Sequence, residues 1–202
     1  MKLGFLASLA LGVSLLTAPA ASAATIIDFT EVAAGTPLDG LTIKGVTFAD
    51  NGGALIGVGG PGSVTYVNDP SSVAIAGEVT MTFAAPTNNL SFGMAFSSHA
   101  AVPNAASISL FDSGSNLIGT FALDALLVDP FAEGQFIYNG PSFIKTATIT
   151  TNFAGEGYAL DNITFDAAPP GGGANSVPLP LATWAGLALG ASIISRRALR
   201  KV

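Results

Sequence analysis

The chain has 202 residues, of which 13 are acidic, 7 are basic and none is cysteine. All 13 acidic residues lie between Asp28 and Asp166, and Lys44 and Lys145 are the only basic residues in that part of the sequence. This acidic body argues against nucleic acid and anionic membrane surfaces as partners, since binding to either needs clusters of Lys and Arg. It favours cations or neutral sugars, and without cysteine the fold must rely on its core rather than on disulfides.

Residues 1–23 have the features of a cleavable signal peptide. Lys2 supplies the positive charge, Leu3–Leu16 is the apolar segment, and Ala21-Ser22-Ala23 matches the cleavage pattern, so the mature chain is expected to start at Ala24. The alternative is an uncleaved anchor, which the short apolar segment and the good cleavage site disfavour. We therefore expect export, with signal peptidase as the first partner.

Residues 24–166 are predicted to form one β domain. Short apolar or alternating segments separated by turn residues are typical of strands. They occur at Thr25–Phe29, Leu41–Ile43, Val46–Phe48, Val64–Val67, Glu78–Phe83, Leu90–Phe96, Ser107–Phe111, Leu117–Leu123, Gln135–Tyr138, Thr146–Thr151 and Tyr158–Phe165. Only Asp124–Phe131 leaves room for a helical turn, which Pro130 limits. The predicted fold class is all-β, an antiparallel β-sandwich or jelly roll.

Three acidic residues are candidate ligands for Ca²⁺, which prefers six to eight hard oxygen ligands. The first and last strands of a jelly roll often lie close together, which would bring Asp28 or Glu31 near Asp161. Asn162 or a backbone carbonyl would then complete the site. The alternative is that Asp28 and Asp161 are polar strand residues that face solvent or cap a turn.

No catalytic residues are predicted. His99 is the only histidine, and its neighbours Ser97 and Ser98 are poorly placed as nucleophiles because sequence neighbours seldom meet in the required geometry. Aromatic side chains offer a different function, since exposed rings can stack on sugars. The candidates are Tyr66, Phe136, Tyr138, Phe143 and Tyr158. The alternative is that most aromatic residues belong to the core.

The C-terminal part of the chain has the features of a linker followed by a targeting segment. Residues 167–176 are predicted from their composition to be a flexible Pro/Gly linker. Residues 177–202 contain a short motif, an apolar segment predicted as a separate transmembrane helix, and a basic stop. The motif is Val177, Pro178, Leu179 and Pro180, and the stop is Arg196, Arg197, Arg200 and Lys201. Basic residues stay in the cytoplasm, so the domain is expected outside it.

This order of motif, apolar segment and terminal arginines resembles the PEP-CTERM sorting signal of exported proteins of Gram-negative bacteria. The family motif is typically Val-Pro-Glu-Pro, and Leu179 stands here in place of the glutamate. The resemblance implies recognition by an exosortase-type enzyme, an inner-membrane intermediate, and delivery to the cell surface or extracellular matrix as a non-enzymatic protein. The alternative is a module that binds extracellular polysaccharide, assisted by Ca²⁺.

Overall fold

The computed structural model describes residues 24–57, 65–68, 73–128, 130–154 and 157–166. The expected signal peptide, linker, sorting motif, transmembrane helix and basic stop all lie outside these residues. Within them every regular element is a β-strand. A search of the same residues found no helix that is long and apolar enough to span a membrane.

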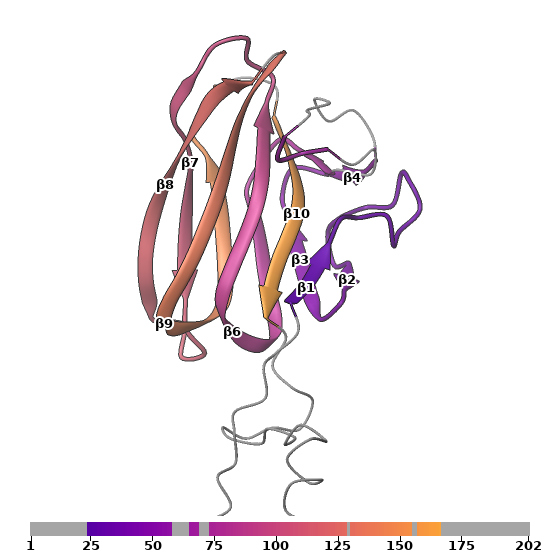
Figure 1. Ribbon diagram of the computed structural model, residues 1–202. Coiled ribbons are helices and arrows are strands. Elements are labelled where there is room, and N and C mark those ends of the chain that lie inside the picture. The colour runs from indigo at the N-terminus through magenta and orange to yellow at the C-terminus, as the bar shows by residue number, and fades with distance from the viewer. Residues whose placement is uncertain (1–23, 58–64, 69–72, 129, 155–156, 167–202) are drawn as a thin grey trace, which may run out of the picture. The chain divides into compact units, whose positions relative to one another are not determined.

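Ten strands form one continuous antiparallel sheet (Figure 1), which confirms the all-β prediction. Its order is β4-β5-β10-β6-β9-β7-β8; in addition, β1 pairs with β10, β3 pairs with β2 and β6, and β8 pairs with β9. The strands are β1 Ala24–Ile27, β2 Thr42–Ile43, β3 Val46–Asp50, β4 Leu55–Ile56, β5 Val73–Ile75, β6 Val79–Phe96, β7 Val102–Phe111, β8 Leu117–Val128, β9 Phe131–Thr151 and β10 Tyr158–Asp166.

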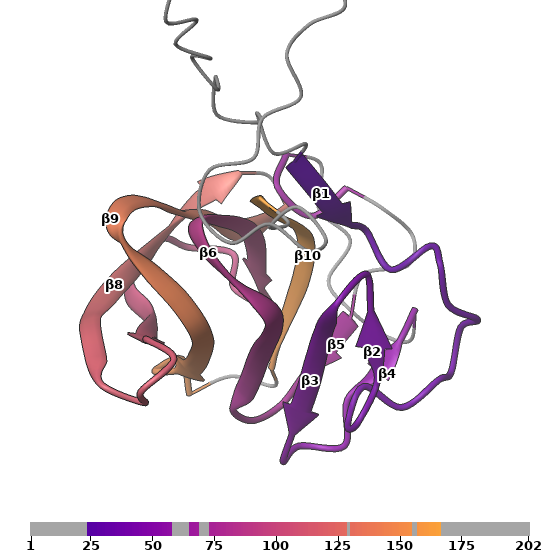
Figure 2. The same ribbon diagram turned by 90° about the horizontal axis from the view of Figure 1, so that it is seen from below.

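The two longest strands, β6 and β9, fold the sheet over into two layers. They pair with each other from Val79↔Ile149 to Phe96↔Ala132, and the register shifts between Thr82 and Asn89. The first part of β6 pairs with β3, whereas its last part pairs with β10. Figure 2 shows the layers from one end, with β8 and β9 curving around one side. Such interruptions bend a strand and increase its twist, which lets one strand serve both layers.

The core lies between the layers. Val79, Met81 and Phe83 of β6 are fully buried, as the alternating sequence predicts. Phe83 meets Phe165 of β10 with ring centroids 5.2 Å apart, so the two layers are in direct contact. Full burial of each large apolar side chain contributes about 1.5–3 kcal/mol. This aromatic core accounts for stability in a domain that has no disulfide.

The structure corrects several predicted boundaries. Two pairs of predicted strands are continuous, in β6 and in β9. The segment predicted as a strand at Val64–Val67 is wrong, because residues 65–67 form a bend. The helical turn considered at Asp124–Phe131 is wrong as well, because β8 continues to Val128. Strands β4 and β5 are only two and three residues long, so they are too short to show the alternation of apolar and polar residues that predicts a strand.

Candidate ligand-binding groove

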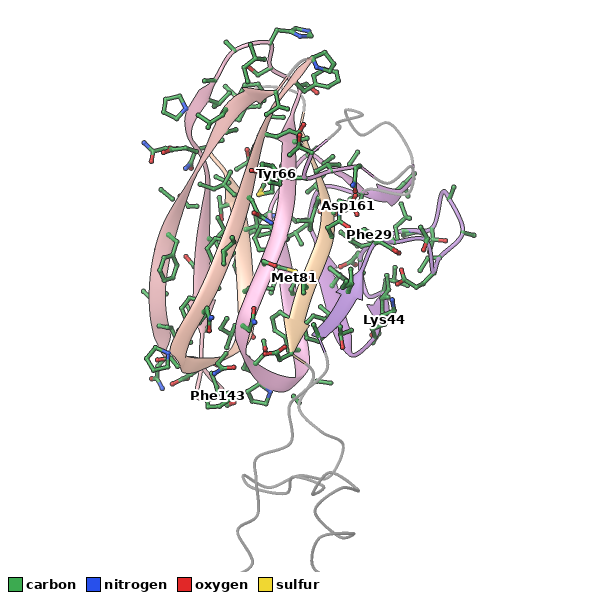
Figure 3. All side chains as sticks on the ribbon, viewed as in Figure 1. Phe29, Lys44, Tyr66, Met81, Phe143 and Asp161 are labelled. Carbon is green, nitrogen blue, oxygen red and sulfur yellow. The ribbon has the colours of Figure 1, made fainter. Side chains whose placement is uncertain are left out.

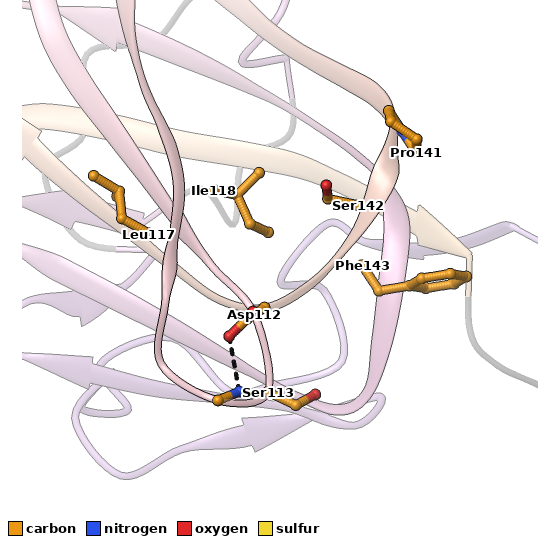
Figure 4. A pocket seen from close by; sticks show the side chains of 8 residues that line it. Asp112, Ser113, Leu117, Ile118, Pro141, Ser142 and Phe143 are labelled. Atoms are coloured by element: carbon orange, nitrogen blue, oxygen red, sulfur yellow. Dashed lines mark hydrogen bonds between the residues drawn. The ribbon is translucent and has the colours of Figure 1, made fainter.

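An open hollow of about 590 Å³ lies at one end of the sandwich (Figure 4). It is formed where the turn between β7 and β8 approaches the middle of β9. The residues that line it are Asp112, Ser113, Gly114, Leu117, Ile118, Pro141, Ser142 and Phe143. Ligand pockets in proteins are commonly about 300–1,000 Å³. We call this hollow the end groove.

Large apolar side chains are exposed at the end groove. Phe143 and Leu117 are each 58% exposed. Pro141 is exposed beside them. Figure 3 shows Phe143 at the lower end of the domain. Exposed apolar side chains that gather at a hollow are typical of interaction sites, whereas scattered ones are not.

Two further aromatic residues connect the end groove to the core. The rings of Phe121 and Tyr138 meet edge to face at 5.8 Å. The Tyr138 hydroxyl donates a hydrogen bond to the Ser142 carbonyl at 3.3 Å, which ties this ring to the groove lining. A Cβ atom on Gly140 would lie 2.4 Å from the Tyr138 ring, so a side chain at this position would displace the ring from its place over the strand.

The polar lining is of two kinds. The Asp112 carboxylate is hydrogen-bonded within its own turn. Its Oδ1 accepts hydrogen bonds from the backbone N–H of Gly114 at 2.8 Å and of Asn116 at 2.9 Å. The hydrogen bond from the Asn116 side chain, followed by those from the backbone, lowers the pKa of Asp112. The hydroxyls of Ser113 and Ser142, in contrast, bond to no group in the described part of the chain. They remain available to a ligand.

Four of the five aromatic candidates for sugar platforms divide into two groups. Phe143 lines the end groove and Tyr138 is half-buried behind it. Phe136 and Tyr158 are only 5% and 1% exposed, so their prediction as exposed platforms is wrong. Burial also raises the pKa of the Tyr158 phenol. These two rings fill the core, which was the alternative given for most aromatic residues.

Tyr66, the fifth candidate, lies on a segment that covers the outer face of β6 (Figure 3). Its backbone N–H donates to Glu133 Oε2 at 2.7 Å. Its carbonyl accepts from the Asn162 side-chain amide at 3.1 Å, and that amide also donates to Asn68. Glu133 is 1% exposed, so its hydrogen bond to the Tyr66 backbone is shielded from water. No sequence pattern indicated this role for Glu133.

The proposed Ca²⁺ ligands lie in three different settings. The predicted adjacency of the first and last strands is confirmed, because Ile27 of β1 pairs with Ile163 of β10. Asp28, however, accepts from the Thr30 hydroxyl at 2.7 Å, the main cause of its lowered pKa. Glu31 forms an ion pair with Lys44. Asp161 is fully buried and accepts from the backbone N–H of Asn162.

No group of three or more His, Cys, Asp or Glu side chains suited to a metal occurs among the residues described. The Ca²⁺ site at Asp28, Glu31 and Asp161 therefore stays a prediction.

His99 and its serine neighbours make no catalytic pair. The Nδ1 atom of His99 bonds to the Pro130 carbonyl at 2.7 Å, and its ring stacks on Phe131 with centroids 5.5 Å apart. The Ser98 hydroxyl donates to the Ala100 carbonyl instead. These contacts give His99 a structural role, because they hold its loop against Pro130 and Phe131.

The sequence matches no family model and no curated protein. Among solved structures, the chain is similar to a mutant of a family 29 carbohydrate-binding module, with 15% identity and a TM-score of 0.36 over 72% of this chain and 92% of that one. It is also similar to the CBM22–GH10 part of a Clostridium thermocellum xylanase, with 12% identity and a TM-score of 0.38 over 72% of this chain and 29% of that one.

A third similar structure is the enzymatically active domain of a tailspike protein from bacteriophage CBA120. The identity is 16% and the TM-score is 0.36, over 62% of this chain. The chain spans 20% of that tailspike domain and 29% of the xylanase structure.

Proposed function

We propose that the domain is a non-catalytic module that binds polysaccharide in the end groove. The observation that carries this proposal is the combination of exposed apolar side chains with free hydroxyls in one open hollow. Phe143 offers a ring face to the C–H face of a sugar, and Ser113 and Ser142 offer hydroxyls to its polar edge. A few polar groups on a mainly apolar lining are typical of small-molecule sites.

The carboxylate content of the end groove favours binding over hydrolysis. Glycoside hydrolysis normally requires two carboxyl groups on either side of the scissile bond. Asp112 is the only acidic residue among the eight that line the groove, and it is held by the hydrogen bonds of its own turn. The geometry therefore supports retention of a glycan rather than its cleavage.

Truncation of the exposed apolar side chains tests the proposal. We expect Phe143→Ala and Leu117→Ala each to weaken retention of the full chain in polysaccharide-containing native gels by about tenfold, which corresponds to about 1.4 kcal/mol. Ile137→Ala is the matched control, because Ile137 is 65% exposed on the outer face of the same strand as Phe143. Equal retention of all three variants and the unmodified protein would contradict the proposal.

For the cellular setting, we propose export and sorting to the cell surface or matrix through the PEP-CTERM-like signal. The support is the sequence of residues 177–202, with its motif, apolar segment and terminal arginines. The intact mass of the protein recovered from the native cell surface or medium tests this. A mass that lacks the segment after about residue 177 is expected. A membrane-bound chain from Ala24 to Val202 would show a plain anchor instead.

A further inference from the structure

We infer that the polysaccharide held in the end groove is uncharged, and that the domain discriminates against polymers rich in carboxylate or sulfate. This inference rests on the proposed function and specifies the class of ligand. Recognition of anionic sugars normally relies on Arg or Lys, which donate charge-assisted hydrogen bonds to carboxylate and sulfate oxygens. The question is therefore whether any basic side chain of the domain is available.

Both lysines of the domain are already engaged. The ammonium group of Lys44 donates to the Ile26 carbonyl at 2.6 Å and forms an ion pair with Glu31. The ammonium group of Lys145 donates to the carbonyls of Phe83 and Ala84, at 2.5 and 2.9 Å. Between Ala24 and Asp166 the sequence has no other Lys and no Arg. An anionic ligand would have to break one of these contacts to gain an ion pair.

The end groove itself carries only negative charge. None of the eight lining residues is basic, and Asp112 is the one titratable group among them. Its pKa is lowered by the hydrogen bonds of its turn, so the carboxylate is ionised at neutral pH. A uronate or sulfate placed in the groove would be repelled, and salt would weaken this repulsion because charges are screened beyond about 8–10 Å at physiological ionic strength. The imidazole of His99 is bonded to the Pro130 carbonyl beside the β8–β9 turn and does not line the groove.

A panel of polymers tests the inference on the full chain. In native gels that contain β-glucan, mannan or xylan, we expect retention by at least one neutral polymer, with less than about a twofold change between about 0.01 M and 1 M salt. In gels that contain alginate, we expect affinity at least about tenfold weaker. Alginate retention as strong as that by the best neutral polymer, lost at high salt, would overturn the inference and leave the proposed function intact. No retention by any polymer would overturn both.

A charge introduced at the groove provides a positive control. Ser113→Lys places an ammonium group on an exposed lining residue and is expected to create alginate retention that high salt removes. Ala33→Lys adds the same charge on the exposed loop after β1 and is expected to leave alginate retention unchanged. Equal gains for both variants would show a net-charge effect, and would overturn the assignment of charge selection to the groove.

Discussion

At the scale of single residues, Gly93 determines how closely the segment Thr65–Asn68 approaches the sheet. A Cβ atom at this position would lie 2.0 Å from the Tyr66 carbonyl oxygen, a separation that atoms cannot adopt. The backbone of Tyr66 therefore crosses β6 where a side chain is missing. Glycine inside a strand often marks such an approach of another backbone.

We expect Gly93→Ala to lower the free energy of unfolding by about 1–3 kcal/mol, because the added methyl group forces Tyr66 away from the sheet. Urea denaturation followed by far-ultraviolet circular dichroism measures this. Ser91→Ala on the same strand is the control and should change stability by less than about 0.5 kcal/mol. If both variants unfold at the same urea concentration, the close approach of Tyr66 is incorrect.

At the scale of elements, the end groove is built by the turn between β7 and β8 and by the interrupted middle of β9. Asp112 organises the turn through its hydrogen bonds to Gly114 and Asn116, and Ser115 takes a φ of 62° there. Such aspartate-centred turns tolerate a left-handed residue. The turn holds Ser113 and Leu117 opposite Phe143, so its geometry decides the shape of the groove.

Protonation of Asp112 should therefore weaken ligand binding. The pKa of Asp112 is lower in the folded chain than in the unfolded one, because the ionised carboxylate accepts the hydrogen bonds of the turn. Its contribution to the stability of the folded turn is therefore fully present above the unfolded pKa and is lost as pH falls through the folded pKa. We expect polysaccharide affinity to be constant from about pH 8 to pH 5 and to fall below about pH 4. Asp112→Asn, which does not titrate, should flatten this fall. A midpoint near neutral pH in the unmodified protein would point to another group.

Local sequence patterns predicted most strands but not how they join. Val79, Met81 and Phe83 alternate with polar residues, and this pattern gave the correct buried face. Pro86 and the Gly140-Pro141 pair are usual turn signals, yet here they lie within β6 and β9. These two strands stay continuous because they pair with each other on both sides of the interruption. Such long-range pairing is a tertiary effect that cannot be predicted from a short segment of sequence.

The end groove was predictable only in its components. Phe143 and Tyr138 were candidates as aromatic residues, and Asp112 and Ser113 lie between two predicted strands. Their meeting depends on the long-range pairing of β7 with β9, for example Phe111 with Thr146. Phe136 was misassigned because an aromatic residue in an alternating segment has the same sequence pattern whether its face of the strand is buried in the core or exposed to solvent.

At the scale of the whole molecule, the separation of apolar and charged residues underlies both the stability of the domain and the selectivity that we propose. The apolar residues at alternate strand positions form a core that needs no disulfide. The acidic residues lie in a domain whose two lysines are held by backbone carbonyls. Among the described residues, the surface carries carboxylates, hydroxyls and exposed apolar side chains, which include those of the end groove. We expect such a surface to repel anionic polymers, and we propose that neutral polymers bind at the end groove.

The most direct test of the central claim is to locate the ligand on the protein. The ¹⁵N-labelled full chain is titrated with a neutral oligosaccharide taken from the polymer that retains it, and amide chemical shifts are followed by NMR. Our account predicts saturable changes concentrated at residues 112–118 and 138–143, with little change in β2 and β3. Changes confined to another face, or no saturable change at any residue, would contradict it.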